Sequence, residues 1–92
     1  MAAANKAGEE AERGARREAA AREREVHALE ARIADLTAAL ANPALYDGGA
    51  EGARRAAGLD RELKEALRGL DQAMARWNEA VEMLTARSAP RR

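Results

Sequence analysis

A proline and a pair of glycines interrupt the middle of the chain, between two long runs that carry leucine-type residues at helical spacing. The interrupting segment reads Asn42-Pro43-Ala44-Leu45-Tyr46-Asp47-Gly48-Gly49. A residue that precedes a proline avoids the helical region, so the first helix should end at Asn42. The Asp-Gly-Gly sequence that follows is typical of a turn. The pattern therefore predicts an all-α fold, an antiparallel two-helix coiled-coil hairpin with a short proline-containing tip.

The run before the tip has apolar residues at alternating steps of three and four, which is the a/d pattern of a coiled-coil seam. Its members are Val26, Leu29, Ile33, Leu36 and Leu40. Extended towards the N-terminus, the pattern falls on charged or small residues, Arg22, Ala19 and Ala15. We therefore expect the seam to weaken in that direction.

From Leu63 onwards, the run after the tip shows the same alternation over a longer stretch, whereas Leu59, Leu63 and Leu67 are separated by two steps of four. Its apolar positions are Leu59, Leu63, Leu67, Leu70, Met74, Trp77, Val81 and Leu84. Neither narrow stripe can be buried by one helix alone, so the two stripes should face each other. The structural seam is predicted to include Leu36, Leu40, Leu63, Leu67, Leu70 and Trp77, with Trp77 against the alanine-lined part of the first helix.

The domain organisation follows from these patterns. Gly8 and Gly14 each lower helix propensity by about 1 kcal/mol relative to alanine, so residues 1–14 are predicted to be a flexible N-terminal segment. The hairpin should span residues 15–87 and be followed by a flexible tail at 88–92. Within the hairpin, the expected parts are a helix at about 15–41, the tip at 42–52 and a helix at about 53–87.

Composition excludes several functions. The 92 residues include no cysteine, so disulfides and thiolate metal sites are absent. The single histidine, His27, is expected to be an ordinary surface residue, and no glycine-rich phosphate loop is present. We predict no enzymatic activity for the chain by itself, no cofactor and no metal. The sequence also lacks an apolar run of the length that crosses a membrane, so a cytoplasmic location and no membrane partner are expected.

Basic residues gather after the tip although the whole chain has a formal net charge of zero. The segment 53–68 holds five basic and three acidic residues, a net charge of +2. Its basic residues are Arg54, Arg55, Arg61, Lys64 and Arg68. Four of them, all except Arg55, recur at helical spacing and could follow a phosphate backbone, in which case binding would weaken steeply with salt. The alternative is a solvated helix face with local ion pairs.

Taken together, these residues resemble the C-terminal coiled-coil domain of ABC-F type ATP-binding cassette proteins. The resemblance rests on the seam from Leu29 to Leu36, on the tip and on the late tryptophan, and it covers residues 15–86. Asn42, Pro43, Tyr46 and Trp77 stand where that family has its turn residues and its tryptophan. The N-terminal helical domain of bacterial peptide chain release factors is a rival resemblance, because it shares a leucine seam and an Asn/Asp-Pro turn; its fit to the tryptophan is poorer.

The resemblance implies a nucleic-acid-binding module that contacts DNA or ribosomal RNA. The contacts would come from the basic residues after the tip, and the tip residues Asn42, Pro43 and Tyr46 would lie close by. ATP binding is not implied, because the chain lacks both cassettes; it would be a fragment or a separately encoded piece that associates with the cassettes of a parent protein. The alternative is a structural interaction module that self-associates or docks on a protein through apolar surface around Leu67, Leu70 and Val81.

Overall fold

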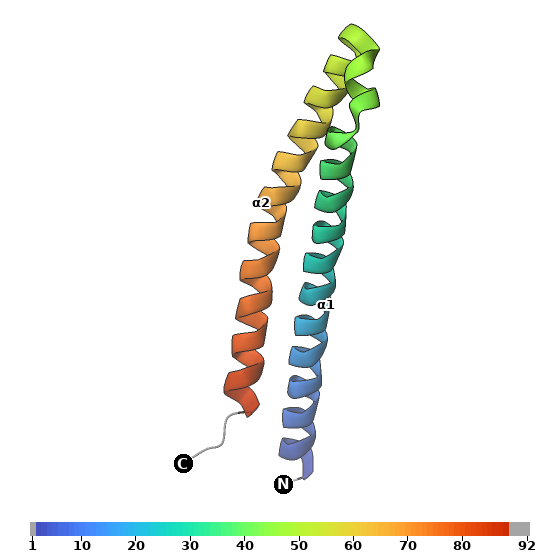
Figure 1. Ribbon diagram of the computed structural model, residues 1–92. Coiled ribbons are helices and arrows are strands. Elements are labelled where there is room, and N and C mark those ends of the chain that lie inside the picture. The colour runs from blue at the N-terminus through green and yellow to red at the C-terminus, as the bar shows by residue number, and fades with distance from the viewer. Residues whose placement is uncertain (1, 89–92) are drawn as a thin grey trace. The chain divides into compact units, whose positions relative to one another are not determined.

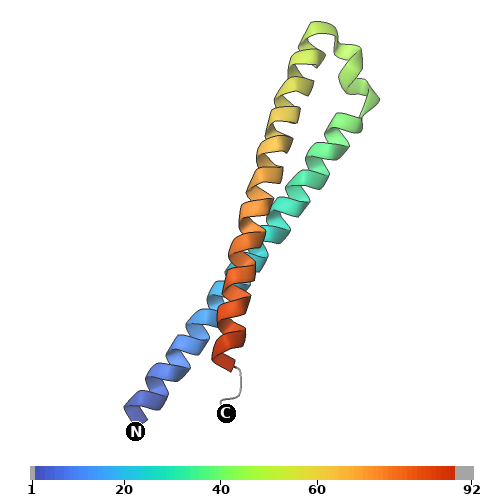
Figure 2. The ribbon, with the colours of Figure 1, turned by 90° about the vertical axis from the view of Figure 1, so that its left-hand side faces the viewer.

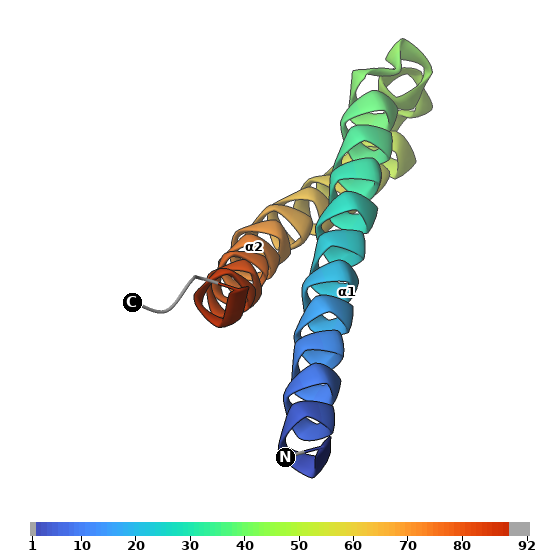
Figure 3. The same cartoon turned by 90° about the horizontal axis from the view of Figure 1, so that it is seen from below.

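The computed structural model describes residues 2–88, and the side chains of residues 6–87 (Figure 1). Helix α1 spans Ala2–Ala41, the 3-10 helix η1 spans Pro43–Gly48, and helix α2 spans Gly49–Ser88. Figures 2 and 3 show α1 and α2 as uninterrupted helices in two further views. The predicted all-α fold, with two long helices packed against each other and joined by a short turn that contains Pro43, is confirmed.

The helices begin earlier than the sequence suggested. Helix α1 starts at Ala2 rather than near Ala15, and α2 starts at Gly49 rather than near Ala53. The glycines of the first segment stand among alanine, glutamate and arginine, which are strong helix formers whose summed propensity outweighs two local defects. Flexibility of residues 1–14 and 88–92 stays a prediction, and residues 89–92 lie outside the described part of the chain.

The chain divides into two units. Unit 1 consists of Met1–Val26 with Ala73–Arg92, and unit 2 consists of His27–Gln72. Unit 2 therefore contains the hairpin itself, with the end of α1, all of η1 and the start of α2 (Figure 1). Unit 1 contains the remaining segments of the same two helices. The two units are described in turn.

In unit 2, leucine-type side chains from α1 and α2 form the core. Leu36 is 7% exposed and Ala66 is 5% exposed. Around them lie half-buried apolar residues: Leu29, Ile33, Leu40, Leu59, Leu63 and Leu70. Leu29 of α1 lies opposite Gly69 of α2 in the antiparallel pair: its Cδ2 atom would lie 3.6 Å from a Cβ added at Gly69.

In unit 1, the core is built mainly from small side chains. The buried residues here are Ala19, Val26, Ala73 and Ala80. Trp77 is half-buried at a seam position between the two buried alanines of α2. Small residues at a helix contact allow the helix axes to approach closely, so this unit has a thin core that relies on helix-to-helix proximity more than on bulky side chains.

The seam of α2 differs in register from the predicted one. Leu67 was expected in the seam but is 45% exposed, and Met74 and Val81 are also exposed. The positions one residue earlier, Ala66, Ala73 and Ala80, are buried instead. Both sets repeat every seven residues, and a step of one residue turns about 100° around the helix. Side-chain size therefore misled the prediction, because the smaller residue of each neighbouring pair faces α1.

Polar contacts hold the tip in place. Asn42 has an extended backbone, with φ −71° and ψ 116°, and its side-chain Oδ1 accepts a hydrogen bond from the backbone N–H of Ala44 at 3.1 Å. Pro43 follows at the first position of η1, where its missing N–H costs nothing. The Tyr46 hydroxyl donates to the Leu40 carbonyl at 2.7 Å. That carbonyl belongs to the last turn of α1, which lacks a partner within the helix, so Tyr46 caps α1.

Two glycines make the tip geometrically possible. Gly49 has φ +62°, a conformation that glycine adopts without strain, at the junction of η1 and α2. Gly52 is buried, and a Cβ added to it would collide with the carbonyl oxygen of Leu45. The backbones of η1 and α2 therefore approach too closely for any other residue at this point.

We predict that Leu36→Ala lowers the free energy of unfolding by about 2–4 kcal/mol, because it leaves a cavity in the core of unit 2. Leu67→Ala is the matched control, since it removes the same atoms from a side chain that is 45% exposed. It should cost less than about 1 kcal/mol. Urea unfolding followed by far-UV circular dichroism measures both, and equal losses would show that α2 packs in the register first predicted from the sequence.

We predict opposite effects of alanine at two glycines of α2. Gly52→Ala should destabilise the hairpin by about 1–3 kcal/mol, because its methyl group overlaps the Leu45 carbonyl oxygen. Gly58→Ala should stabilise it by up to about 1 kcal/mol, because alanine is the better helix former and a Cβ there would lie 3.9 Å from the nearest side-chain atom, Arg61 Nη2. Thermal melts of the two variants decide this, and a stabilised Gly52→Ala variant would contradict the close approach.

Candidate nucleic-acid interface

Three arginines of unit 2 form one stripe along α2. Arg54, Arg61 and Arg68 are all exposed and recur every seven residues. Seven residues span about 10.5 Å of helix and nearly two full turns, so the three side chains emerge from one face. Counted at about 100° per residue, this face points away from the seam that contains Leu63 and Leu70. We refer to Arg54, Arg61 and Arg68 as the arginine stripe.

The guanidinium groups of the arginine stripe are available for a ligand. Among the side chains of residues 6–87, none makes a hydrogen bond or an ion pair with any of the three. Glu65 lies on the same face. The three arginines and this carboxylate together carry a net charge of +2. An exposed arginine that has no partner within the protein can bind phosphate without first breaking an ion pair.

The other two predicted contact residues are placed differently. Lys64 is exposed at the edge of the stripe and pairs with Asp60, with 3.0 Å between Nζ and Oδ2. Arg55 is exposed but is turned about 100° from Arg54. It lies towards the tip, where it lines hollows beside Ala44 and Leu45. The structure thus brings three of the five predicted residues onto one face, and Arg55 lies beside that face, where it shares a hollow with Arg61.

A second set of arginines without partners occurs in unit 1. Arg13, Arg17 and Arg24 are exposed on α1, and no hydrogen bond or ion pair reaches them from the described side chains. Their surroundings are more acidic: residues 9–26 hold five arginines and six glutamates, a net charge of −1. Residues 53–68 have a net charge of +2, so the local field favours the arginine stripe on α2.

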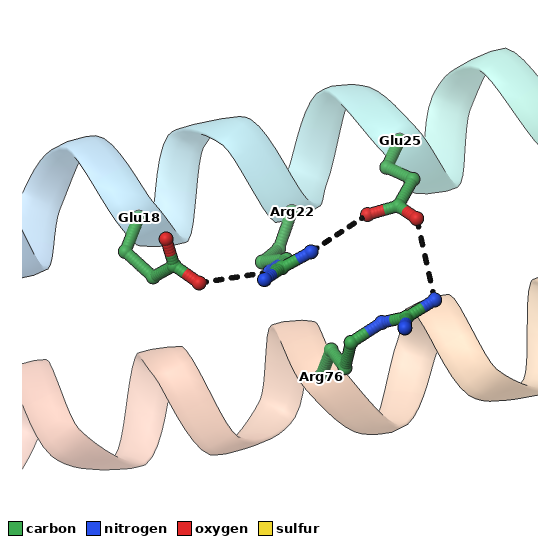
Figure 4. A network of polar contacts seen from close by, with 4 residues as sticks. All are labelled: Glu18, Arg22, Glu25 and Arg76. Atoms are coloured by element: carbon green, nitrogen blue, oxygen red, sulfur yellow. Dashed lines mark hydrogen bonds and ion pairs between the residues drawn. The ribbon is translucent and has the colours of Figure 1, made fainter.

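Four charged residues of unit 1 form a connected network of hydrogen bonds and ion pairs (Figure 4). Arg22 donates through Nε to Glu18 at 2.9 Å and through Nη1 to Glu25 at 3.2 Å. The hydrogen bond that Arg22 donates to Glu18, followed by the one it donates to Glu25, raises the pKa of Arg22 above its usual range. Glu25 also accepts from Arg76 of α2 at 3.3 Å. This chain of four residues connects the two helices of unit 1 and is unsuited to binding phosphate.

The corresponding cross-helix pair of unit 2 is looser. Arg32 of α1 lies 3.6 Å from Glu62 of α2, and both side chains are about half exposed. Exposed pairs of this kind contribute at most about 1 kcal/mol. His27 pairs with Glu30 at 3.1 Å on the exposed side of α1, which agrees with a surface role.

Two other kinds of feature are absent from the described residues, a metal-binding cluster and a membrane-spanning helix. Residues 2–88 contain no group of three or more histidine, cysteine, aspartate or glutamate side chains placed to hold a metal ion. Over the same range, no helix has an apolar stretch long enough to cross a membrane. The arginine stripe and the tip are therefore the features of unit 2 to compare with known proteins.

The family model for the ABC transporter C-terminal domain matches residues 10–82. The chain belongs to this family. The domain is the one found in ABC-F proteins, so the suspected resemblance is confirmed. No curated protein and no solved structure matches the chain. Asn42, Pro43, Tyr46 and Trp77 carried the resemblance, and in this domain the first and third of them hold the tip through hydrogen bonds.

We predict that Glu25 and Arg76 are coupled by about 0.2–1 kcal/mol, as is usual for exposed ion pairs. A double-mutant cycle with Glu25→Gln and Arg76→Gln measures this coupling from urea unfolding. It should shrink when salt is raised from about 50 to about 500 mM, because salt screens exposed charges. Arg24→Gln combined with Glu25→Gln is the control, since Arg24 has no partner among the described residues. Coupling unaffected by salt would argue against an ion pair.

Proposed function

We propose that this domain binds nucleic acid, DNA or ribosomal RNA, through the arginine stripe on α2. The observation that supports the proposal most directly is the set of exposed guanidinium groups without partners, aligned at heptad spacing on one face of α2. Arginine presents several N–H donors in a planar fork that matches phosphate oxygens. The domain acts as a binding module and is non-catalytic by itself.

The contact is of the sequence-independent kind. A rigid helix holds the three guanidinium groups about 10.5 Å apart along its axis, so each can reach a different phosphate. Lys64 stands at the edge of the stripe, and its pair with Asp60 is exposed enough to be exchanged for a phosphate contact. Phosphate contacts position a protein on nucleic acid and carry no direct information on base sequence.

Binding in a larger assembly is part of the proposal. Membership of the ABC transporter C-terminal domain family supports an association with ATP-binding cassettes. In such an assembly the domain would supply nucleic-acid contacts, and the cassettes would supply ATP hydrolysis. Contact with the ribosome and a cytoplasmic location belong to this proposal as well.

A second candidate function is docking or self-association through apolar surface. In unit 1, Met74, Val81 and Met83 are exposed. Contiguous exposed apolar patches mark protein contacts, and Met74 and Val81, seven residues apart, lie on one face of α2. Light scattering separates the two candidates: a strict monomer that binds nucleic acid supports the arginine stripe, and a dimer without nucleic-acid binding supports the apolar surface.

The test is a titration of the full chain with labelled duplex DNA, branched DNA and structured RNA at about 50 and 200 mM salt. We expect micromolar binding at the lower salt that weakens steeply at the higher, because each phosphate contact releases counterions. The triple variant Arg54→Gln, Arg61→Gln and Arg68→Gln should abolish most of this binding. For residual duplex binding, the negative slope of log K against log salt should become shallower by up to about 2.7, which corresponds to three phosphate contacts at about 0.9 each.

The matched control is the triple variant Arg13→Gln, Arg17→Gln and Arg24→Gln. It removes the same number of charges from exposed arginines that also lack described partners, but from α1. It should leave most of the binding intact. No binding by the unmodified chain at about 50 mM salt would exclude the proposed function, and equal losses in both triple variants would show that the stripe on α2 is not the site.

A further inference from the structure

Arg55 is a cation that the arginine stripe does not use. It follows Arg54 in the sequence but projects about 100° away around α2. It lines hollows at the tip of unit 2 as well as one that it shares with Arg61. Like the arginine stripe, it has no hydrogen bond or ion pair with the described side chains. A cation beside a hollow, with no internal partner, is suited to a ligand with a negative group.

The hollow between the end of α1, η1 and the start of α2 has mainly apolar walls. Its lining residues are Ala39, Asn42, Ala44, Leu45, Arg55 and Leu59. Leu45 and Leu59 are both half-buried, so each still has apolar surface to cover. We refer to this set as the tip hollow. It lies wholly within unit 2, and two of its lining residues, Arg55 and Leu59, also line a neighbouring hollow together with Arg61 of the arginine stripe.

The polar side chains of the tip hollow are donors. The Oδ1 atom of Asn42 is engaged by the backbone N–H of Ala44 at 3.1 Å, which fixes the orientation of the amide and directs its NH2 group away from the cap. Arg55 has N–H donors and no acceptor. A ligand that fits must therefore combine an apolar body with a group that only accepts hydrogen bonds, as an ionised carboxylate does.

We propose that the tip hollow binds the C-terminal residue of a partner polypeptide, when that residue has a leucine-type side chain. The side chain would cover Leu45 and Leu59, and the terminal carboxylate would accept hydrogen bonds from Arg55 and from the amide of Asn42. Capture of a C-terminal carboxylate beside an apolar pocket is a known mode of peptide recognition. Adenine, guanine and cytosine fit less well, because their amino groups would face donors and apolar walls. This surface adds a protein contact to the proposed nucleic-acid contact.

The probe is N-acetyl-leucine, which mimics such a C-terminal residue, and its control is N-acetyl-leucinamide, which lacks only the carboxylate. Both are titrated into the isotope-labelled full chain and followed by two-dimensional NMR. We expect saturable shifts at the Asn42 side-chain amide and at the backbone of Leu45 and Leu59, with an affinity on the order of millimolar for so small a ligand. The amide control should bind about tenfold more weakly, since it loses the charge-assisted contact with Arg55.

Two variants test the donors separately. Arg55→Gln removes the cation, and Asn42→Asp retains the acceptor that caps η1 while it replaces the NH2 donors with a negative charge. Each should weaken N-acetyl-leucine binding about tenfold or more, and unchanged circular dichroism shows that the hairpin is intact. Arg54→Gln is the control: it should leave probe binding unchanged while it weakens nucleic-acid binding. Equal binding of the two probes, shifts confined to other residues, or full binding by Arg55→Gln would overturn the proposal.

Discussion

Burial of a narrow seam shared by two helices is the interaction on which this domain depends. Neither helix has enough apolar surface to fold a core by itself, and each unit is stable only where a segment of α1 covers a segment of α2. In unit 2 the seam is made of leucine-type residues around Leu36, whereas in unit 1 it is made largely of alanine and Val26. The unit with the smaller side chains also carries the cross-helix ion pair between Glu25 and Arg76.

The tip makes this pairing possible, because it reverses the chain within a few residues and still satisfies its backbone groups. Asn42 caps η1 and the Tyr46 hydroxyl caps the last turn of α1. Gly52 allows η1 and α2 to approach each other closely. Three of the residues that carried the resemblance to the family, Asn42, Pro43 and Tyr46, are thus explained by the structure of the turn. Binding partners of the domain should instead contact the nearby arginines of unit 2 that have no hydrogen bond or ion pair with the described side chains.

The unpaired arginines of unit 2 point in two directions. The arginine stripe points away from the seam and offers three guanidinium groups to phosphates. Arg55, one residue after the first of them, turns towards the tip hollow and its apolar walls. Adjacent arginines on a helix point in directions about 100° apart. Under the two proposals, the domain would present a nucleic-acid contact and a protein contact side by side.

The sequence by itself determined the fold class, the position of the turn and the seam of α1, because these follow from helical periodicity and from the backbone limits of proline and glycine. It also located the basic segment after the tip. Only the tertiary structure decided the register of α2, where Ala66, rather than Leu67, faces the partner helix. Two stripes offset by one residue have the same periodicity, so periodicity cannot decide which of them faces α1. That choice depends on how closely the two helices pack. The same packing decided which arginines pair across the helices, Arg32 with Glu62 and Arg76 with Glu25, since the two partners of each pair come from different helices.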